Sequence, residues 1–447
     1  MKFPDPQSKS AALFARARCV MPGGNTRHMI TFDPYVIYAD RGQGCRVTDV
    51  DGNTYIDWAN TFSALIHGYG HPAIHEAVTR QLARMTACIL PTEVEIELAE
   101  LLVERMPAVE QVRFANSGTE AVMVAIKAAR GHTGRPLIVK CEGGYHGQYD
   151  FVEPSFLPTP DNWGPRERPA VMPFARGTPQ GVLDNVVVIP FNELEIARVL
   201  LEERAAEIAG VIIDPYPARL GFTAAEPEFL GALREFCDRN GSVLIFDEVF
   251  CNRASYHGAH GRVGVLPDLV TLGKIIGGGF PIGAIGGRTA VMAVFDNLAG
   301  PPAVSHSGTF TGNPIAMVAG LAAMRLLTPL MFDRLARQSD RLRAGLTRQI
   351  HAAGLAMRAN GFGSMTSLQL FRDPIRTYRE FHLQSGAGYL RRMQDLHRYM
   401  LNEGVLVATR GLMIGSTPMT DDDIDETIER CGRALTGFAT AASRSDA

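Results

Sequence analysis

Short apolar runs alternate with helix-like segments through the middle of this 447-residue chain. The helix-like segments include 120–130 and 227–239. Short, wholly apolar strands separated by helices are typical of a mainly parallel sheet covered on both faces. Between residues 70 and 325 the runs predict strands at 112–115, 137–140, 186–189, 211–213, 243–246 and 269–271.

The two ends of the chain have a different pattern. Near the N-terminus three short strands are predicted at 35–38, 44–47 and 54–57, with Asp51-Gly52-Asn53 as a hairpin turn between the last two. Beyond residue 326 a long amphipathic helix at 331–352 precedes short strands at 364–370 and 405–408. We therefore predict a large domain at 61–325 and a smaller α+β domain made from 1–60 and 326–447.

Composition narrows the class of protein. The chain is 46% hydrophobic and 20% charged, as in ordinary globular proteins, and its net charge is 44 − 47 = −3. This balance gives no reason to expect nucleic acid or a membrane as a partner, and no apolar run approaches the roughly 20 residues of a spanning helix. The seven cysteines form no Cys-x-x-Cys pair, and the first twenty residues have no apolar core, so we expect no secretory signal. We expect a cytoplasmic protein.

The polar residues that end the predicted strands matter most, because parallel sheets bind ligands beyond the carboxyl ends of their strands. Asn116-Ser117-Gly118-Thr119-Glu120 follows one strand and opens a helix. Small residues there let backbone N–H groups and two hydroxyls converge on an anion. The same residues would also serve as an ordinary helix N-cap, and the sequence leaves both interpretations open.

Two further strand ends carry an aromatic residue and an acid. Gly143-Gly144-Tyr145-His146-Gly147 would turn sharply and present Tyr145 at the sheet edge, although a loop with a buried tyrosine is an equal alternative. Asp247-Glu248 ends a wholly apolar run, where an unpaired acid is costly. Asp247 therefore needs a cation or a donor such as a protonated pyridine nitrogen, unless it forms a cap or a structural salt bridge.

Lys274 follows the next strand in a glycine-rich, apolar turn, Gly273-Lys274-Ile275-Ile276-Gly277. Desolvation there would lower its pKa and make the amine nucleophilic. Four strand ends thus supply an anion cradle, an aromatic plate, an acid and a lysine, the partners that a phosphorylated aromatic aldehyde requires.

Metal binding is not expected, because the closely spaced histidines lie in Gly/Pro-rich sequence; they are His67, His71 and His75, and His257 and His260.

With these residues in place, the chain resembles the class III aminotransferases, which are fold-type I pyridoxal-phosphate (PLP) enzymes. The likeness runs from about Met21 through nearly the whole chain. It is carried by Asn116-Ser117-Gly118-Thr119-Glu120-Ala121, Gly144-Tyr145-His146-Gly147, Phe246-Asp247-Glu248-Val249, Leu272-Gly273-Lys274 and Ser307-Gly308-Thr309-Phe310.

Two further segments refine the resemblance. Pro22-Gly23-Gly24-Asn25, with the stretch from Ser307 to Pro314, is similar to the glutamate-1-semialdehyde aminomutase branch. Within that branch, Met21 to Arg27 and Thr409-Arg410-Gly411 are most similar to aminotransferases of aromatic β-amino acids. The resemblance implies an α/β fold with a seven-stranded-type, mainly parallel sheet sandwiched by helices.

The resemblance also implies residue roles. Lys274 would carry PLP as a Schiff base, and Asp247 would keep the pyridine nitrogen protonated. Ser117, Gly118 and Thr119 would bind the phosphate. Tyr145 and Val249 would contact the two faces of the ring, and His146, next to Tyr145 in its motif, would belong to the same cofactor site. Thr309 would reach the phosphate of a neighbouring subunit, in a homodimer with shared active sites. Arg27 and Arg410 would bind the substrate carboxylate, because a guanidinium fork suits a carboxylate; pairing with structural carboxylates is the alternative.

The implied activity is transfer of an amino group from an amino acid to a 2-oxo acid by way of pyridoxamine phosphate, with Lys274, Asp247 and Tyr145 as catalytic residues. The expected donor is a β-amino acid with an aromatic or other apolar side chain. Intramolecular transfer, as in glutamate-1-semialdehyde 2,1-aminomutase, is one rival, and a non-catalytic PLP- or phosphate-binding module is another. Two departures from class III matter. Asp214-Pro215 replaces the usual Glu-Pro, and its acid reaches less far by one methylene. Residues 250–257 lack the usual glycine- and arginine-containing stretch, which puts in doubt the switching arginine of ordinary ω-aminotransferases and with it the amino acceptor.

Overall fold

The computed structural model describes residues 3–30, 32–298 and 300–445, apart from the side chains of His28 and 442–445. The chain forms two compact units. Unit 1 comprises Met1–Pro72, Leu330–Pro374 and Gln384–Ala447, and unit 2 comprises Ala73–Pro329 and Ile375–Leu383. These bounds differ from the predicted domains in that 61–72 lie in unit 1 and 326–329 lie in unit 2. Residues 375–383, predicted as part of the small domain, also lie in unit 2. The segment belongs to unit 2 because Arg379 pairs with the buried Glu142 there.

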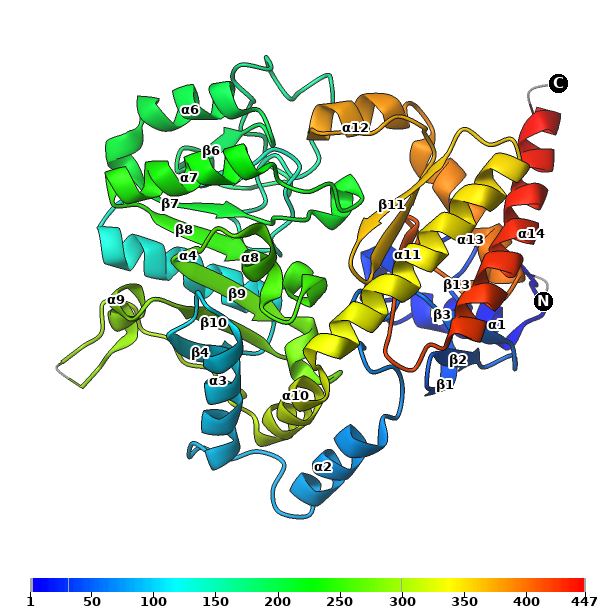
Figure 1. Cartoon of the computed structure of the whole chain (residues 1–447), viewed down its shortest axis with the longest axis horizontal. Helices are drawn as coiled ribbons and strands as arrows, with labels where there is room; N and C mark the ends of the chain where they lie inside the picture. Colours follow the sequence, from blue (N-terminus) through cyan, green and yellow to red (C-terminus); the bar gives the residue numbers. More distant parts are fainter. Residues whose placement is uncertain (1–2, 31, 299, 446–447) are drawn as a thin grey trace. The chain divides into compact units, whose positions relative to one another are not determined.

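A seven-stranded sheet forms the centre of unit 2 (Figure 1). All its strands share one direction except β10, which pairs antiparallel with β4 and β9. The mainly parallel sheet expected from the sequence is confirmed. In spatial order the strands are β4 (Gln111–Ala115), β10 (Gly283–Gly287), β9 (Leu269–Gly273), β8 (Val243–Asp247), β7 (Ile208–Ile213), β5 (Leu137–Cys141) and β6 (Val186–Ile189).

The sequence analysis missed β10, because three of its five residues are glycine and no β-branched pattern marks it. Packing explains the glycines. A Cβ at Gly283 would lie 2.0 Å from the carbonyl oxygen of Ser117, and one at Gly287 would lie 2.3 Å from that of Asp268. A side chain at either position would force the neighbouring strand ends apart.

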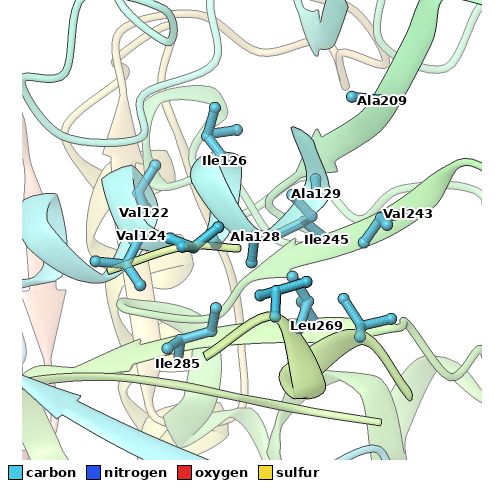
Figure 2. Close-up of a cluster of buried hydrophobic side chains, with 14 of the residues drawn as sticks. Val122, Val124, Ile126, Ala128, Ala129, Ala209, Val243, Ile245, Leu269 and Ile285 are labelled. Carbon is cyan, nitrogen blue, oxygen red and sulfur yellow. The ribbon is translucent and has the colours of Figure 1, made fainter. Parts of the chain in front are cut away.

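Helix α4 (Gly118–Thr133) crosses one face of this sheet and packs on β7, β8, β9 and β10. Figure 2 shows Val124, Ala128 and Ala129 of α4 near Val243, Ile245 and Leu269 of the strands, all of them buried in one cluster. Since side chains alternate along a strand, Leu244 and Phe246 point to the opposite face. Helix α7 packs against β7 and β8, and α6 packs against β6.

Unit 2 contains nine described helices besides α4. Their bounds are α2 (Pro72–Leu82), α3 (Glu93–Arg105), α5 (Gln180–Leu183), α6 (Leu194–Glu203), α7 (Pro227–Asn240), α8 (Gly258–Val263), α9 (Thr289–Met292), α10 (Pro314–Leu326) and α12 (Tyr378–Ser385).

Unit 1 joins the two ends of the chain. Strand β13 pairs in parallel with β3, and a shared core contains Phe3, Tyr55 and Leu401. One sheet has the order β1 (Ala39–Gln43), β2 (Arg46–Asp49), β3 (Thr54–Asp57) and β13 (Val405–Leu406); the other has β11 (Arg358–Phe362), β12 (Met365–Gln369) and β14 (Leu412–Ile414). The helices are α1 (Lys9–Arg18), α11 (Pro329–Ala352), α13 (Tyr389–Asn402) and α14 (Asp421–Ser445).

The N-terminal meander differs from its prediction at one strand. Residues 35–38 are not a strand; β1 begins at Ala39, and the hydroxyl of Tyr35 instead donates to the carbonyl of Asp5 at 2.6 Å. Tyr35 and Val36 are buried among side chains of the unit 1 core rather than paired in a ladder. The hairpin at Asp51-Gly52-Asn53 is confirmed, since β2 pairs antiparallel with β3 on either side of it.

Among the described residues no single helix is both long enough and apolar enough to span a bilayer. Helices α10 and α11 pass that length and composition test only when joined across a bend. Most residues of α10 are buried in the fold.

Candidate active site

Three charged side chains lie at the carboxyl ends of adjacent strands in unit 2. Asp214 follows β7, Asp247 ends β8 and Lys274 follows β9. The strand order β9-β8-β7 places these ends side by side. The charges of Asp214 and Asp247 both act on the Lys274 amine. The sheet thus brings together the acid and the lysine that the sequence predicted.

Asp247 is buried and held by three donors. The Nδ1 atom of His146 lies 2.8 Å from one carboxylate oxygen, and the hydroxyl of Thr271 donates to the other at 2.8 Å. The N–H of Val249 also donates to that second oxygen, at 3.1 Å. Burial by itself would raise the pKa of Asp247, but the hydrogen bond and charge of His146, with the other donors, outweigh it and lower the pKa below its ordinary value. Asp247 is therefore held as a carboxylate.

Lys274 has a left-handed backbone, with φ of 50°, at the start of the 3-10 turn Lys274–Gly277. Its ammonium nitrogen lies 4.5 Å from the centroid of the Phe250 ring. Burial lowers the pKa of Lys274 to about 8, although Asp247 and Asp214 oppose the shift. A positive φ is strained for a residue with a side chain, and such strain concentrates at functional sites. The amine is thus uncharged in a useful fraction near neutral pH.

Asp214 is a member of the site that the sequence analysis treated only as a departure from Glu-Pro. Burial and the nearby charge of Asp247 raise its pKa to about 7, while the N–H of Tyr216 donates to it at 2.9 Å and opposes the shift. Its position at the end of β7, in line with the other two strand ends, was the signal that could have identified it.

Ser117 caps helix α4, as the alternative interpretation of that motif proposed. Its hydroxyl oxygen accepts from the N–H of Glu120 at 3.1 Å, and the Glu120 carboxylate accepts from the N–H of Asn116 at 2.6 Å. The cap does not preclude an anion, because the hydroxyl can still donate and the first N–H groups of a helix have no partner within it.

Gly118 and Thr119 begin α4 beside two other parts of the site. A Cβ at Gly118 would lie 2.6 Å from Cγ1 of Val249, so only glycine fits against that side chain. Thr119 approaches Gly147, where a Cβ would lie 2.6 Å from the threonine hydroxyl, and the same hydroxyl accepts from the N–H of Gln148 at 3.3 Å. The helix start, Val249 and the Tyr145 loop therefore converge.

Tyr145 projects from the loop after β5 and is 51% exposed in the isolated chain. Its ring centroid lies 5.1 Å from that of Phe156. Burial of the hydroxyl and the charges of Asp247 and Glu153 raise the pKa of Tyr145, while the positive charge of Arg219 opposes them. Tyr145 thus lies within electrostatic range of Asp247, as expected of a ring placed over the same ligand.

The base of the Tyr145 loop is anchored by residues that the sequence analysis did not identify. Glu142 is buried and accepts from two guanidinium nitrogens of Arg379, both at 2.9 Å. Arg379 also donates to the carbonyls of Trp163 and Gly164. The ring of Tyr378 covers Gly143, where a Cβ would lie 2.0 Å away. Sequence separation of more than 230 residues hides this anchor from any local pattern.

Thr309 lies in an exposed loop of unit 2. Its neighbour Gly308 lies close to Asn116, since a Cβ there would be 3.6 Å from the Asn116 side-chain amide nitrogen. The loop is therefore near the start of α4, while the Thr309 side chain remains open to another molecule.

Arg27 and Arg410 both belong to unit 1, and the structure places their segments together. Arg410 lies in a tight turn between β13 and β14, closed by the N–H of Gly411 donating to the carbonyl of Ala408 at 2.8 Å. The hydroxyl of Thr409 in the same turn donates to the carbonyl of Met29 at 2.9 Å. The Arg27 carbonyl in turn accepts from Ile30. The two predicted carboxylate ligands therefore come from adjacent segments.

A model of the class III aminotransferases, described as "Aminotransferase class-III", matches residues 31–435. The chain belongs to the class III aminotransferases. As a member of this class it is a PLP-dependent aminotransferase that uses an amino donor and a keto-acid acceptor. Its sheet and covering helices form the fold-type I architecture expected from the sequence.

Individual relatives refine this placement of the aminotransferase. Glutamate-1-semialdehyde 2,1-aminomutase 2 of Bacillus licheniformis is 37% identical over 436 residues, covering 96% of this chain and 97% of the relative. The structure of an omega-transaminase from Sphaerobacter thermophilus is 47% identical in sequence, has a TM-score of 0.93, and matches over 98% of this chain and 99% of its own. The structure of a beta-phenylalanine aminotransferase from Variovorax paradoxus is 34% identical, has a TM-score of 0.85, and matches over 97% of this chain and 94% of its own. The predicted likeness to both branches is confirmed.

The residues of this aminotransferase fit PLP. A carboxylate has about four acceptor positions, and Asp247 uses three for protein donors, so one remains for a pyridinium N–H. The helix start at Gly118 has N–H groups and hydroxyls that could bind a phosphate, and Val249 lies against this helix start, where it and Tyr145 could contact a ring. Among the described residues no group of three metal-ligating side chains occurs; His257 bonds the carbonyl of Arg105, and His260 bonds Glu248.

Proposed function

We propose that this aminotransferase takes the amino group of a β-amino acid with an aromatic or other apolar side chain and passes it to a 2-oxo acid. The observation that carries the substrate class is the contact between the Thr409-Arg410 turn and the segment that follows Arg27, where the Thr409 hydroxyl donates to the Met29 carbonyl. With their segments adjacent, Arg27 and Arg410 would both be available to one carboxylate. The likeness to a beta-phenylalanine aminotransferase supports the same class.

The cofactor supplies an aldehyde that takes up the amine and a pyridine ring that withdraws electrons from the amine-bearing carbon. Around it, Ser117, Gly118 and Thr119 would hold the phosphate. Tyr145 and Val249 would contact the two ring faces. Asp247, itself oriented by His146, would accept a hydrogen bond from the protonated pyridine nitrogen and keep it charged.

Lys274 would hold the cofactor covalently and then act as the base. Its pKa of about 8 leaves part of the amine uncharged near neutral pH, so that it can remove a proton from the amine-bearing carbon. Asp214 and Asp247 would stabilise the ammonium that results, because both carboxylates act on the lysine. The Phe250 ring packs against the amine and contributes to its desolvation.

A homodimer with shared active sites belongs to the same proposal. Ile89, Leu90 and Ile96 are 100%, 68% and 59% exposed in the isolated chain, and Phe310 beside Thr309 is 59% exposed. The loop that carries Phe310 adjoins the other segment, because the Asn313 side-chain amide donates to the Thr86 carbonyl at 3.0 Å. Large apolar side chains open to water on neighbouring segments favour burial against another protein surface. A second copy would cover them and would receive the Thr309 hydroxyl at its phosphate site.

Intramolecular transfer of the glutamate-1-semialdehyde 2,1-aminomutase kind is the second candidate, because a protein of that name is 37% identical over 96% of this chain. The two activities differ in one observable. An aminotransferase releases a keto product from its donor and needs a separate acceptor, whereas the aminomutase returns the amine to the same molecule. A non-catalytic binding module is disfavoured by Lys274, whose lowered pKa serves no purpose in simple phosphate binding.

The test compares 3-amino-3-phenylpropanoate with its decarboxylated analogue, 1-phenylethylamine, and with α-phenylalanine, in wild type, Arg27→Met and Arg410→Met. Arg41→Met, an exposed unit 1 arginine paired with Asp40, is the matched control. We expect the β-amino acid to react fastest and to lose on the order of 10- to 100-fold in kcat/KM in at least one variant, since a charged hydrogen bond contributes about 1.5–3 kcal/mol. Equal rates with the analogue, or unchanged kinetics in both variants, would reject the β-amino acid. Net conversion of glutamate-1-semialdehyde without an acceptor would favour the aminomutase.

A further inference from the structure

Arg219 is a half-buried arginine of unit 2 to which neither the motifs nor the proposed function assign a role. It lies in the 3-10 turn η4 (Ala218–Leu220), five residues beyond Asp214. Its guanidinium carbon lies 4.4 Å from the centroid of the Phe156 ring, a cation–π contact. The guanidinium is thus held on an aromatic surface.

That aromatic surface adjoins Tyr145. The Phe156 centroid lies 5.1 Å from Tyr145 and 5.0 Å from Phe174, and both neighbours remain about half exposed. The charges of Arg219 and Asp247 both act on the Tyr145 hydroxyl. Arg219 therefore lies on the Tyr145 side of the cofactor site, beside exposed aromatic rings.

The same turn also approaches Lys274. Phe222 follows Arg219 by three residues, and its ring centroid lies 5.7 Å from that of Phe250, which contacts the Lys274 amine. The turn is closed by the N–H of Phe222, which donates to the carbonyl of Pro217 at 3.1 Å. Arg219 is therefore carried on an ordered turn between the reacting lysine and the Tyr145 loop.

We infer that Arg219 binds the second carboxylate of the amino acceptor, and that the acceptor is a dicarboxylic 2-oxo acid of the 2-oxoglutarate type. The inference rests on the proposed function, in which donor and acceptor occupy one site in turn. The flat face of a guanidinium stacks on aromatic rings, whereas its N–H edge binds a carboxylate in a bidentate manner. A single arginine fixed on Phe156 can therefore accept an aromatic donor side chain and then an acidic acceptor side chain.

Two variants distinguish binding of the acceptor's second carboxylate by Arg219 from a purely structural role of Arg219 in holding its turn against Phe156. Arg219→Met retains most of the apolar stem that packs on Phe156 but removes the charge, and Arg219→Lys retains the charge but loses the planar fork. Arg198→Met, which removes an exposed arginine of α6 paired with Glu195, is the control. Each holoenzyme is assayed with one donor and two acceptors, 2-oxoglutarate and pyruvate, which differ in the second carboxylate.

We expect KM for 2-oxoglutarate to rise on the order of 10- to 100-fold in Arg219→Met, with KM for pyruvate and kcat within about twofold of wild type. Arg219→Lys should lie between the two. Calorimetric titration of the holoenzyme should show glutarate binding more tightly than butyrate in the wild type and in Arg198→Met, but not in Arg219→Met.

Equal losses with both acceptors, or a glutarate preference that survives Arg219→Met, would overturn the inference and make Arg219 structural. A wild type that uses pyruvate but not 2-oxoglutarate would also overturn it, while leaving aminotransfer intact. Failure of the proposed function is seen separately, because a half-reaction with 3-amino-3-phenylpropanoate alone changes the cofactor absorbance without any acceptor. The glutarate titration tests Arg219 even then.

Discussion

His146 and Asp247 form a buried pair in which the imidazole Nδ1 lies 2.8 Å from a carboxylate oxygen. His146 lies in the loop after β5 and Asp247 ends β8, 101 residues apart in the chain. The pair keeps the pKa of Asp247 below its ordinary value despite burial. Asp247 is therefore ionised through its protein partners alone, and its negative charge would be available to a pyridinium.

Asp247→Asn should retain the cofactor but lose most of its activity. An amide cannot balance a positive pyridine nitrogen, and a charged hydrogen bond of this kind contributes about 1.5–3 kcal/mol, so kcat should fall by at least roughly tenfold. Thr271→Val removes one donor to the same carboxylate and keeps the volume, so its loss should be smaller. Stopped-flow measurement of the donor half-reaction checks both. Near-normal rates in Asp247→Asn would show that the acid is structural.

Covalent capture of the cofactor by the apoprotein should follow the protonation of Lys274. Only the uncharged amine is a nucleophile, and burial lowers its pKa to about 8. The capture rate should therefore rise about tenfold per pH unit below that value and level off above it. The rate of absorbance change after mixing apoprotein with PLP between pH 6 and 9 measures this. A rate still rising at pH 9 would contradict the lowered pKa.

Borohydride should fix the cofactor on the peptide that contains Lys274, and Lys274→Ala should neither be labelled nor turn over substrate. Lys140 is a useful comparison, because burial lowers its pKa to about 7 but its amine donates to the carbonyl of Pro154 at 2.7 Å. Mass spectrometry of the digested protein locates the label. Label on Lys140 would show that the wrong lysine has been assigned.

Gly118→Ala should weaken cofactor binding, because the added Cβ would lie 2.6 Å from Val249. Overpacking of this kind costs about 1–3 kcal/mol, and the strain displaces either the helix start or the ring contact. Val249→Ala in the same chain should restore much of the affinity. Gly231→Ala, on α7 with open space around its Cβ, should leave PLP affinity unchanged. Fluorescence titration of the apoproteins with PLP measures the Kd of each variant. An unchanged Kd in Gly118→Ala would show that Gly118 is not part of the phosphate site.

Leu90→Asp should shift the protein from dimer to monomer, because the aspartate would be buried without a partner in the proposed interface. Val199→Asp alters an equally apolar, 60% exposed residue of α6 and should leave the dimer intact. Sedimentation equilibrium measures the change. Hybrids of Lys274→Ala and Thr309→Ala subunits should regain some activity if the Thr309 change is severe alone. A wild type that is fully active as a monomer would refute shared sites.

The amino-acid sequence by itself determined the elements whose signals are local. Apolar runs such as 186–189 and 243–246 became strands within a residue of their predicted ends, since burial on both faces demands continuous apolar sequence. The order of motifs at strand ends identified Asp247 and Lys274 for the same reason: a parallel sheet turns sequence order into spatial adjacency. The class of enzyme followed from those positions together with the family resemblance.

The tertiary structure alone decided what depends on partners distant in sequence. Strand β10 has too many glycines to be recognised, yet neighbouring carbonyls leave room for nothing larger. Residues 375–383 belong to unit 2 rather than to the small domain because Arg379 pairs with the buried carboxylate of Glu142, more than 230 residues away in sequence. The roles proposed for Asp214 and Arg219 could be inferred only from the fold, which brings their charges within range of Lys274 and Tyr145. Coulombic and packing energies depend on distance in space, which periodicity along a chain does not encode.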